Sequence, residues 1–292
     1  MKKDKTVLLV DDDEDDRLLL SDALTELIEN IEVIEMGSGK ELLSILLSGE
    51  TERIIPDLIL LDMNMPELNG LEILSKIKED RSLREIPTVM LSTASHKDLI
   101  AQAYRAGVNA FMVKPITASE YEMVASAVNI CFLNNLAPGH LDAVFKSHKD
   151  SNIVVIEDND DHWNLLNFSI KQSMPRVNMI RLRDQRGAME YFESSLKSVD
   201  SLPDMILLDL YLPVRDAGLA LLEHIRYRIE INKLPPVPII VLSYSDNRED
   251  VKASYARQAN SYMIKPLDPN NWPVYFKNLT HFWSKTISLP KQ

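Results

Sequence analysis

One pattern of apolar runs and polar residues occurs twice in this 292-residue chain, and the repeat constrains the fold more than any other feature. In each copy, four polar marks end four apolar runs in one order: an acidic pair, an aspartate, a serine and a Lys-Pro dipeptide. The marks are Asp11-Asp12, Asp62, Ser92 and Lys114-Pro115 in the first copy, and Glu157-Asp158, Asp209, Ser243 and Lys265-Pro266 in the second. The serine and the lysine lie 22 residues apart in both copies. A duplicated domain with short loop insertions explains this agreement.

The apolar runs predict short strands that are buried on both faces of a sheet, because they are continuous rather than alternating. The expected strands are residues 6–10, 32–36, 58–61, 88–92 and 110–114 in the first copy, and 152–156, 177–183, 205–208, 238–243 and 261–265 in the second. Apolar residues recur at helical spacing in other segments, for example over 20–28, 121–128 and 272–283. Alternating strands and helices predict an α/β fold with a parallel sheet. We expect domains at 1–136 and 151–292 and a linker at 137–150.

The composition argues against several classes of protein. A net charge of −12 disfavours electrostatic binding to nucleic acid. No apolar run approaches the roughly 18 residues that indicate a membrane span, so no membrane association is expected. The single cysteine, Cys131, rules out an intramolecular disulfide and fits a reducing cytoplasm. A cytoplasmic location is therefore expected.

The four marks of each copy should meet in one crevice, because the functional crevice of a doubly wound sheet opens at the carboxyl ends of its strands. Three carboxylates at such an edge would repel one another unless a cation lay among them. Oxygen ligands with room for water suit Mg²⁺. An aspartate held there can form an aspartyl phosphate. The pattern therefore indicates metal-assisted chemistry on a carboxylate.

This order of residues resembles the receiver domain of bacterial two-component response regulators, over nearly the whole chain and in both copies. The segment NICFLNNLAP is similar to the C-terminal turn of the short single-domain regulators that partner phytochrome-type kinases. The resemblance implies two tandem flavodoxin-like doubly wound domains, each with a five-stranded parallel sheet and helices on both faces. It also implies a phosphorelay function, with Mg²⁺ as cofactor and a histidine kinase or histidine phosphotransfer protein as phosphodonor.

In the first copy the resemblance makes Asp62 the phosphoryl acceptor. Asp12 is then a direct ligand of Mg²⁺, and Asp11 acts largely through water. The backbone carbonyl of Asn64 is expected to be a further ligand.

The resemblance also assigns roles to the serine and the Lys-Pro dipeptide. Lys114 is expected to pair with a phosphate oxygen, and the Ser92 hydroxyl to donate a hydrogen bond to another. In this family that hydrogen bond lets the aromatic residue at Phe111 turn inward. The Lys114-Pro115 peptide bond is cis in most relatives, so a cis bond is expected here.

The second copy has the same parts with substitutions. The equivalent site residues are Glu157, Asp158, Asp209, Tyr211, Ser243 and Lys265. Tyr211 stands where the first copy has Asn64, and Tyr244 where it has Thr93. The two rings are expected to crowd the approach to Asp209, so this acceptor should gain phosphate more slowly than Asp62.

Other polar residues are interpreted as structural. The acidic residues 13–16 are read as a solvated helix start, because carboxylates interact favourably with the helix dipole there. The histidines show no metal-binding spacing and are read as surface or packing residues: His96, His140, His148, His162, His224 and His281. The chain has neither a phospho-histidine motif nor a Gly-rich ATP loop, so it is not its own kinase.

Two functions from different classes remain open. One is a response regulator that signals by contact with a downstream protein or by forming a homodimer, without a separate catalytic output domain. Family habit places its output face near residues 97–135. The other is an adaptor or scaffold whose receivers serve docking or dimerisation with little or no phosphorylation. An aspartyl-phosphate phosphatase is disfavoured, because Asn64 and Tyr211 stand where such an enzyme needs a second aspartate.

Overall fold

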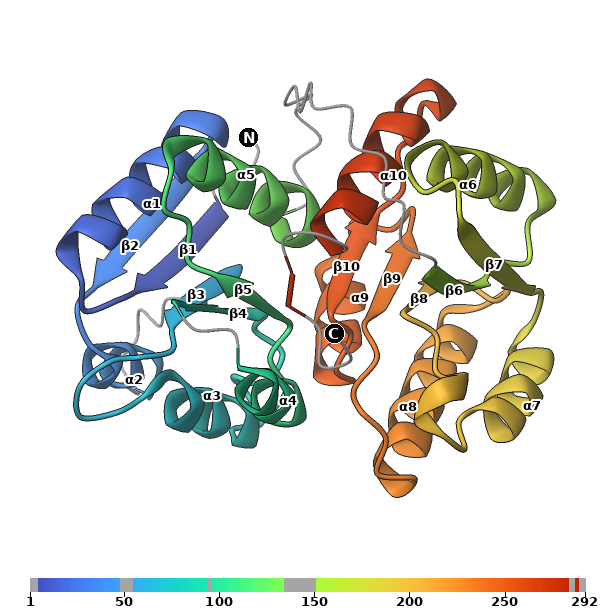
Figure 1. Ribbon diagram of the computed structural model, residues 1–292, viewed down its shortest axis with the longest axis horizontal. Helices are drawn as coiled ribbons and strands as arrows, with labels where there is room; N and C mark the ends of the chain where they lie inside the picture. The colour runs from blue at the N-terminus through green and yellow to red at the C-terminus, as the bar shows by residue number, and fades with distance from the viewer. Residues whose placement is uncertain (1–4, 48–54, 94–95, 134–150, 284–286, 289–292) are drawn as a thin grey trace. The chain divides into compact units, whose positions relative to one another are not determined.

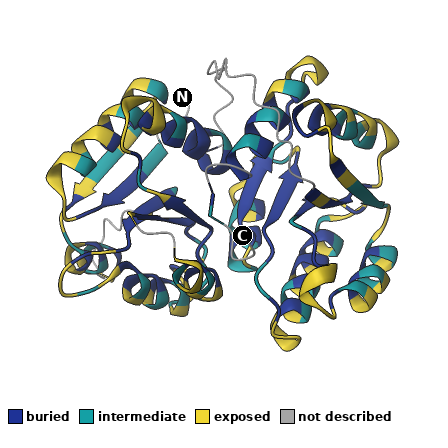
Figure 2. Cartoon of the chain, viewed as in Figure 1, coloured by how far each residue is buried: buried dark blue, intermediate teal, exposed yellow. Residues whose placement is uncertain are grey.

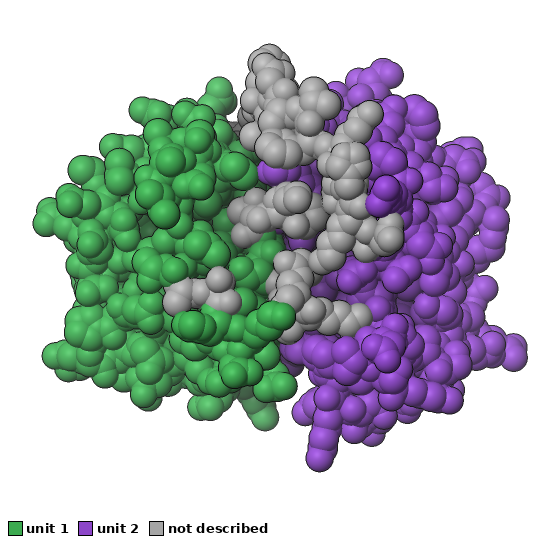
Figure 3. All heavy atoms as spheres, viewed as in Figure 1, with its two compact units in different colours: residues 1–140, 286–292 green, residues 141–285 purple. Residues whose placement is uncertain are grey.

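The computed structural model describes residues 5–47, 55–93, 96–133, 151–283 and 287–288. The chain divides into two compact units, residues 1–140 with 286–292 and residues 141–285, coloured green and purple in Figure 3. The expected linker at 137–150 lies outside the described residues.

The first unit is a five-stranded parallel sheet with strand order β2-β1-β3-β4-β5. Its strands are β1 (Lys5–Val10), β2 (Ile31–Met36), β3 (Leu58–Asp62), β4 (Thr88–Ser92) and β5 (Ala110–Val113). Its helices are α1 (Glu14–Leu27), α2 (Gly39–Leu47), α3 (Gly70–Glu79), α4 (Lys97–Arg105) and α5 (Ala118–Val128), followed by a π-helical turn, η1 (Asn129–Leu133). Figure 1 shows α1 and α5 on one face of the sheet and α2, α3 and α4 on the other.

The second unit repeats this topology, with strand order β7-β6-β8-β9-β10. Its strands are β6 (Ser151–Ile156), β7 (Val177–Leu182), β8 (Met205–Asp209), β9 (Ile239–Ser243) and β10 (Ser261–Ile264). Its helices are α6 (Asp160–Ser173), α7 (Gln185–Ser195), α8 (Arg215–Ile231), α9 (Arg248–Ala256) and α10 (Trp272–His281), with short 3₁₀ turns η2 (Val199–Ser201) and η3 (Pro269–Asn271). The predicted fold of two doubly wound α/β domains is therefore confirmed.

The central strands form the core of each unit. Every residue of β3, β4, β8 and β9 is buried, and Figure 2 shows dark blue strands between helices whose outer faces are exposed. Helices cover both faces of each sheet, which is why these strands are continuous apolar runs. Each fully buried leucine or isoleucine side chain contributes roughly 1.5–3 kcal/mol of hydrophobic stabilisation. Burial of these runs therefore positions the residues that end them.

A glycine lets the helix after each central strand start close to the end of that strand. A Cβ atom at Gly70, the first residue of α3, would collide with the carbonyl oxygen of Asp62. A Cβ atom at Gly218, in α8, would collide with the carbonyl oxygen of Leu210. The backbone approach that each glycine permits brings the helix against the end of the strand, at Asp62 in the first unit and at Leu210, directly after β8, in the second.

The described residues of the C-terminal tail pair with β5 of the first unit. Ile287 forms an antiparallel bridge with Met112, and the Ser288 N–H donates to the carbonyl oxygen of Phe111 at 2.8 Å. The Ile287 side chain is buried. Sequence analysis placed this tail in the second domain, whereas the structure groups residues 286–292 with the first unit. β5 is the edge strand of its sheet, so its outer edge was open to such pairing.

Candidate functional site

The first crevice forms where four strands of the first unit end. Asp11 directly follows β1, Asp62 ends β3, Ser92 ends β4 and Lys114 directly follows β5. β1 and β3 are neighbours, and the chain order reverses between them, so this is the topological switch point of the sheet. The structure thus brings together the four marks that sequence analysis expected to meet.

Lys114 is the central cation of this crevice. Its ammonium group lies 2.7 Å from Asp11 Oδ2, 2.9 Å from Asp16 Oδ2 and 3.1 Å from Asp62 Oδ1. Burial acts to lower the pKa of Lys114, but the hydrogen bonds to Asp11 and Asp16 and the charge of Asp62 raise it above its ordinary value. The lysine is therefore a permanent positive charge between carboxylates.

Asp16 was not expected in this site. Sequence analysis read it as part of a solvated helix start, and for Asp16 that interpretation is wrong, because its carboxylate contacts Lys114 and also accepts a hydrogen bond from the Tyr121 hydroxyl at 3.3 Å. Asp13 does lie at the helix start as expected, and the structure adds a capping role, since its side chain accepts from the N–H groups of Asp15 and Asp16. Asp16 lies in the first turn of α1, and its side chain reaches into the crevice to contact Lys114.

The carboxylates of this crevice fit a divalent cation. Asp11, Asp12 and Asp62 each offer an oxygen atom, and these three oxygens lie within 4.8 Å of one another. Burial raises the pKa of Asp11 and of Asp62, while contact with Lys114 opposes that shift. Asp62 Oδ1 accepts no hydrogen bond from any residue that the structure describes, although Lys114 lies close to it. A buried anionic oxygen of this kind suits a hard cation such as Mg²⁺.

The expected partners of Asp62 lie near it. The Asn64 N–H donates to Asp62 Oδ2 at 2.8 Å, which places Asn64 beside this carboxylate. The Asn64 side-chain amide donates to Ser92 Oγ at 3.5 Å. Phe111 is fully buried, so its ring already lies inward. The expectation of a cis Lys114-Pro115 bond was wrong: in the described part of the chain the one cis peptide bond is Leu212-Pro213.

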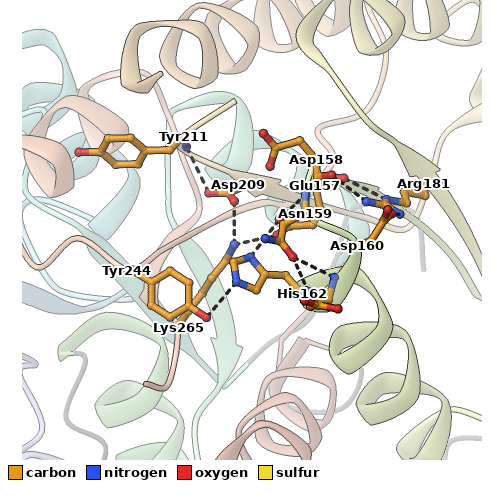
Figure 4. Close-up of polar contacts among 11 residues, drawn as sticks. Glu157, Asp158, Asn159, Asp160, His162, Arg181, Asp209, Tyr211, Tyr244 and Lys265 are labelled. Atoms are coloured by element: carbon orange, nitrogen blue, oxygen red, sulfur yellow. Dashed lines mark hydrogen bonds and ion pairs between the residues drawn. The ribbon is translucent and has the colours of Figure 1, made fainter. Parts of the chain in front are cut away.

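The second crevice forms at the equivalent strand ends of the second unit, and Figure 4 shows its polar contacts. The Lys265 ammonium lies 2.7 Å from Glu157 Oε2 and 2.8 Å from Asp209 Oδ2. Burial acts to lower the pKa of Lys265, but the charges of Asp209 and Glu157 raise it. Burial, together with the charge of Glu157, raises the pKa of Asp209, and Lys265 opposes the shift. Lys265 therefore contacts Asp209 as Lys114 contacts Asp62 in the first crevice.

His162 lies in this crevice, although sequence analysis did not place it there. Its Nδ1 lies 3.2 Å from Glu157 Oε1, and its Nε2 lies 3.3 Å from the Tyr244 hydroxyl (Figure 4). The interpretation as a surface or packing residue is incomplete for His162, which packs against Tyr244 and Trp272 but also contacts Glu157. A usable signal existed, because His162 lies 146 residues after Asp16, the same offset that separates Glu157 from Asp11.

Asp158 differs in place from its counterpart Asp12. Glu157, His162 and Asp209 offer ligand atoms within 4.8 Å of one another, whereas Asp158 is not a member of that group. The Asp158 side chain is exposed, and its carbonyl oxygen accepts from Arg181 Nη2 at 3.1 Å. An imidazole thus stands in the second group where the first has a third carboxylate.

Neither tyrosine lies over Asp209. The Tyr211 N–H donates to Asp209 Oδ1 at 3.2 Å, but the Tyr211 hydroxyl donates to Asp250 Oδ2 at 3.0 Å, so its ring points away (Figure 4). The Tyr244 ring centre lies 5.5 Å from Lys265 Nζ, and its hydroxyl meets His162. The Asp209 side chain is 10 % exposed, against 2 % for Asp62. The geometry therefore does not support the expected crowding of Asp209.

Comparison with known proteins agrees with this arrangement. The family described as the response regulator receiver domain matches residues 7–125 and 153–274. A chemotaxis protein CheY homolog of Campylobacter jejuni is 33 % identical over 111 residues, which are 38 % of this chain and 82 % of that protein. Response regulator Rcp1 of Synechocystis is 35 % identical over 139 residues, which are 47 % of this chain and 92 % of that protein. The crystal structure of a phosphorylated cyanobacterial phytochrome response regulator, RcpA, is 32 % identical, covers 47 % of this chain and 99 % of its own, and has a TM-score of 0.43.

Proposed function

The chain belongs to the response regulator receiver family, with two receiver domains in tandem, and from this premise we propose that it accepts a phosphoryl group on Asp62 and signals by changing its protein contacts. The observation that carries the proposal is the environment of Asp62. Its buried carboxylate lies beside Lys114, within 4.8 Å of two further carboxylate oxygens, and one of its own oxygens accepts no hydrogen bond from the described residues. The phosphodonor would be a histidine kinase or a histidine phosphotransfer protein.

The residues around Asp62 would have different roles in phosphoryl transfer, some binding the metal ion and others neutralising charge. Asp11, Asp12, Asp62 and the carbonyl group of Asn64 would hold Mg²⁺, which neutralises charge on the transferred group. Lys114 neutralises the acceptor and would pair with a phosphate oxygen as a compact charge. Asp16 contacts the same ammonium group and so keeps it in the crevice when phosphate arrives.

Asp209 is the proposed acceptor of the second receiver. Lys265 is its cation, Ser243 its hydroxyl donor, and Glu157 with Asp158 its acidic pair, while Tyr211 offers a backbone carbonyl in place of that of Asn64. Asp209 has a partner on each oxygen, the Tyr211 N–H on one and Lys265 on the other. Asp62 has the equivalent pair of neighbours, the Asn64 N–H and the Lys114 ammonium, so these contacts give no reason for the two acceptors to differ in rate, and slower phosphorylation of Asp209 stays a prediction.

The contacts of Glu157 favour a second candidate function for this receiver. Both oxygens of Glu157 also have partners, which are Lys265 on one side and the Asn159 N–H with His162 on the other. A receiver held together in this way would serve as an adaptor or dimerisation module with little or no phosphorylation.

The experiment that tests these functions is the mass of the intact protein after incubation with Mg²⁺ and a small-molecule phosphodonor. The variants Asp62→Asn and Asp209→Asn separate the two acceptors, because each change is nearly isosteric and removes one nucleophile. Gain of phosphate that is lost in Asp62→Asn supports the response regulator. No gain in the wild-type protein would refute it and favour the adaptor.

Several further properties belong to this proposal. The part of the chain that the structure describes contains no helix both long and apolar enough to span a bilayer. We propose a cytoplasmic protein without membrane or nucleic-acid partners. Its output would be contact with a downstream protein or a second copy rather than catalysis by a separate domain.

A further inference from the structure

Two substitutions at matched positions distinguish the crevices of the two receivers. In the first receiver, Asp16 on α1 contacts Lys114 and accepts from the hydroxyl of Tyr121 on α5. In the second receiver, His162 on α6 occupies the position of Asp16, and Trp272 at the start of α10 that of Tyr121. The rings of His162 and Trp272 lie 5.9 Å apart. The first crevice thus has a carboxylate hydrogen-bonded to a phenol, whereas at the same positions the second has an imidazole beside an indole.

The imidazole changes the set of ligand atoms that the crevice offers to a metal ion. Glu157, His162 and Asp209 present two carboxylate oxygens and one ring nitrogen within 4.8 Å of one another. Lys265 contacts Glu157 Oε2 and Asp209 Oδ2, whereas Tyr211 N–H contacts the other oxygen of Asp209. Because a carboxylate oxygen can accept more than one interaction, these contacts leave lone pairs for an ion.

We propose that the crevice of the second receiver binds a divalent first-row transition-metal ion, such as Co²⁺ or Zn²⁺, in preference to Mg²⁺, with His162 as a nitrogen ligand. Imidazole suits these ions, while Mg²⁺ prefers oxygen ligands and gives up water reluctantly. The first receiver, whose group holds carboxylates alone, keeps the preference for Mg²⁺. This inference rests on the proposed function only in treating the second crevice as a site for a divalent cation.

A histidine that ligates a metal through one ring nitrogen needs a hydrogen-bond partner on the other, and the Tyr244 hydroxyl is that partner for His162. Without an ion, His162 Nδ1–H can donate to Glu157 Oε1 while Nε2 accepts from the Tyr244 hydroxyl. When an ion binds Nδ1, the neutral imidazole carries its one proton on Nε2 instead, with no net release of a proton, and this Nε2–H donates to the hydroxyl oxygen of Tyr244. Such an outer partner holds a ligating imidazole in one tautomer and one orientation. Tyr244 is thus a positioning residue.

The three tryptophans make a reporter for this site in the intact chain. Trp163, Trp272 and Trp283 all lie in the second unit, so tryptophan fluorescence reports on the second receiver. Co²⁺ quenches a nearby indole, and Trp272 is adjacent to His162. We expect saturable quenching of the full-length protein by Co²⁺, and Mg²⁺ should reverse it only at an excess of at least about tenfold.

Matched variants test the role of the imidazole. His162→Asp restores the residue of the first receiver and should reduce the Co²⁺ over Mg²⁺ preference by about tenfold or more. Tyr244→Phe should weaken Co²⁺ binding by about tenfold through loss of the outer contact. The reciprocal variant Asp16→His should increase the number of Co²⁺ ions retained per chain in equilibrium dialysis against excess Mg²⁺.

The outcomes separate this inference from the proposed function. A preference that is unchanged in His162→Asp, or wild-type quenching that an equal amount of Mg²⁺ reverses, would overturn the inference. If His162→Asp unfolds, Asp16→His decides, and an unchanged count of retained Co²⁺ overturns it. Phosphorylation of Asp62 with Mg²⁺ alone, followed by mass, does not involve His162. The proposed function therefore stands or fails independently of the metal preference.

Discussion

Replacing Lys265 by methionine should destabilise the second receiver strongly when no divalent cation is present. Methionine keeps most of the side-chain volume and removes the charge. The lysine is 1 % exposed and contacts both Glu157 and Asp209, so its loss leaves two buried carboxylates without their shared cation. Breaking a buried ion pair by removing one partner costs about 3–5 kcal/mol. We expect a loss near the lower end, about 3 kcal/mol, because a carboxylate left alone can take up a proton.

Urea denaturation followed by tryptophan fluorescence measures this loss in the intact chain, since every tryptophan lies in the second unit. With a slope of about 2 kcal/mol per molar urea, a loss of about 3 kcal/mol lowers the midpoint by about 1.5 M. Lys171→Met, at an exposed lysine of α6, is the control and should leave the midpoint unchanged.

A second comparison isolates charge from packing. Adding Glu157→Gln and Asp209→Asn to Lys265→Met removes the buried negative charges and should recover most of the lost stability. The deficit of Lys265→Met alone should also shrink in acid, where the carboxylates are protonated. A midpoint within about 0.3 M of the wild-type value at neutral pH would refute the reasoning, because it would mean that solvent already screens the pair.

Three further predictions concern the first receiver. Burial raises the pKa of Asp62 in the folded protein, so without divalent cations the contribution of Asp62 to stability is fully present below the pKa of the unfolded chain, near 3.8, and is lost as the pH rises through the folded pKa. The melting temperature of Asp62→Asn should therefore depend less on pH than that of the wild-type protein. Identical pH dependence in the two proteins would contradict the predicted direction. Lys78 donates to the carbonyl oxygen of Ile86 at 2.8 Å, and burial lowers its pKa to about 7; Lys78→Met should cost about 1–3 kcal/mol in urea, while Lys78→Arg should be tolerated, because Arg226 makes the equivalent contact in the second receiver. Ile287→Asp places a charge at a buried position against β5 and should speed hydrogen exchange of β5 amides, whereas unchanged exchange would show that the tail pairing does not protect the strand.

Much of the fold and of the composition of both crevices follows from the sequence alone. A continuous apolar run such as Leu58–Leu61 is compatible with a strand that is buried on both faces, and a polar residue that ends it must lie at the edge of the sheet. Asp62, Ser92 and Lys114 end neighbouring strands, so their meeting follows from the order of the strands. The duplication adds an internal check, because each mark in one half predicts its counterpart in the other.

The tertiary structure alone decided how side chains from helices and loops enter the crevices. Asp16 and His162 lie on helices after an acidic stretch, where sequence favours solvent, and their contacts with Lys114 and Glu157 depend on how each helix packs against its sheet.

The direction of a ring and the pairing of a chain end are likewise absent from local sequence. Tyr211 turns toward Asp250, 39 residues later in the chain, because that carboxylate accepts from its hydroxyl. Ile287 pairs with Met112 because β5 is an edge strand with free backbone groups. The pattern of apolar residues in the sequence determines which residues end a buried strand. Contacts between residues distant in sequence depend instead on how the helices, loops and chain end pack, and only the folded chain supplies that geometry.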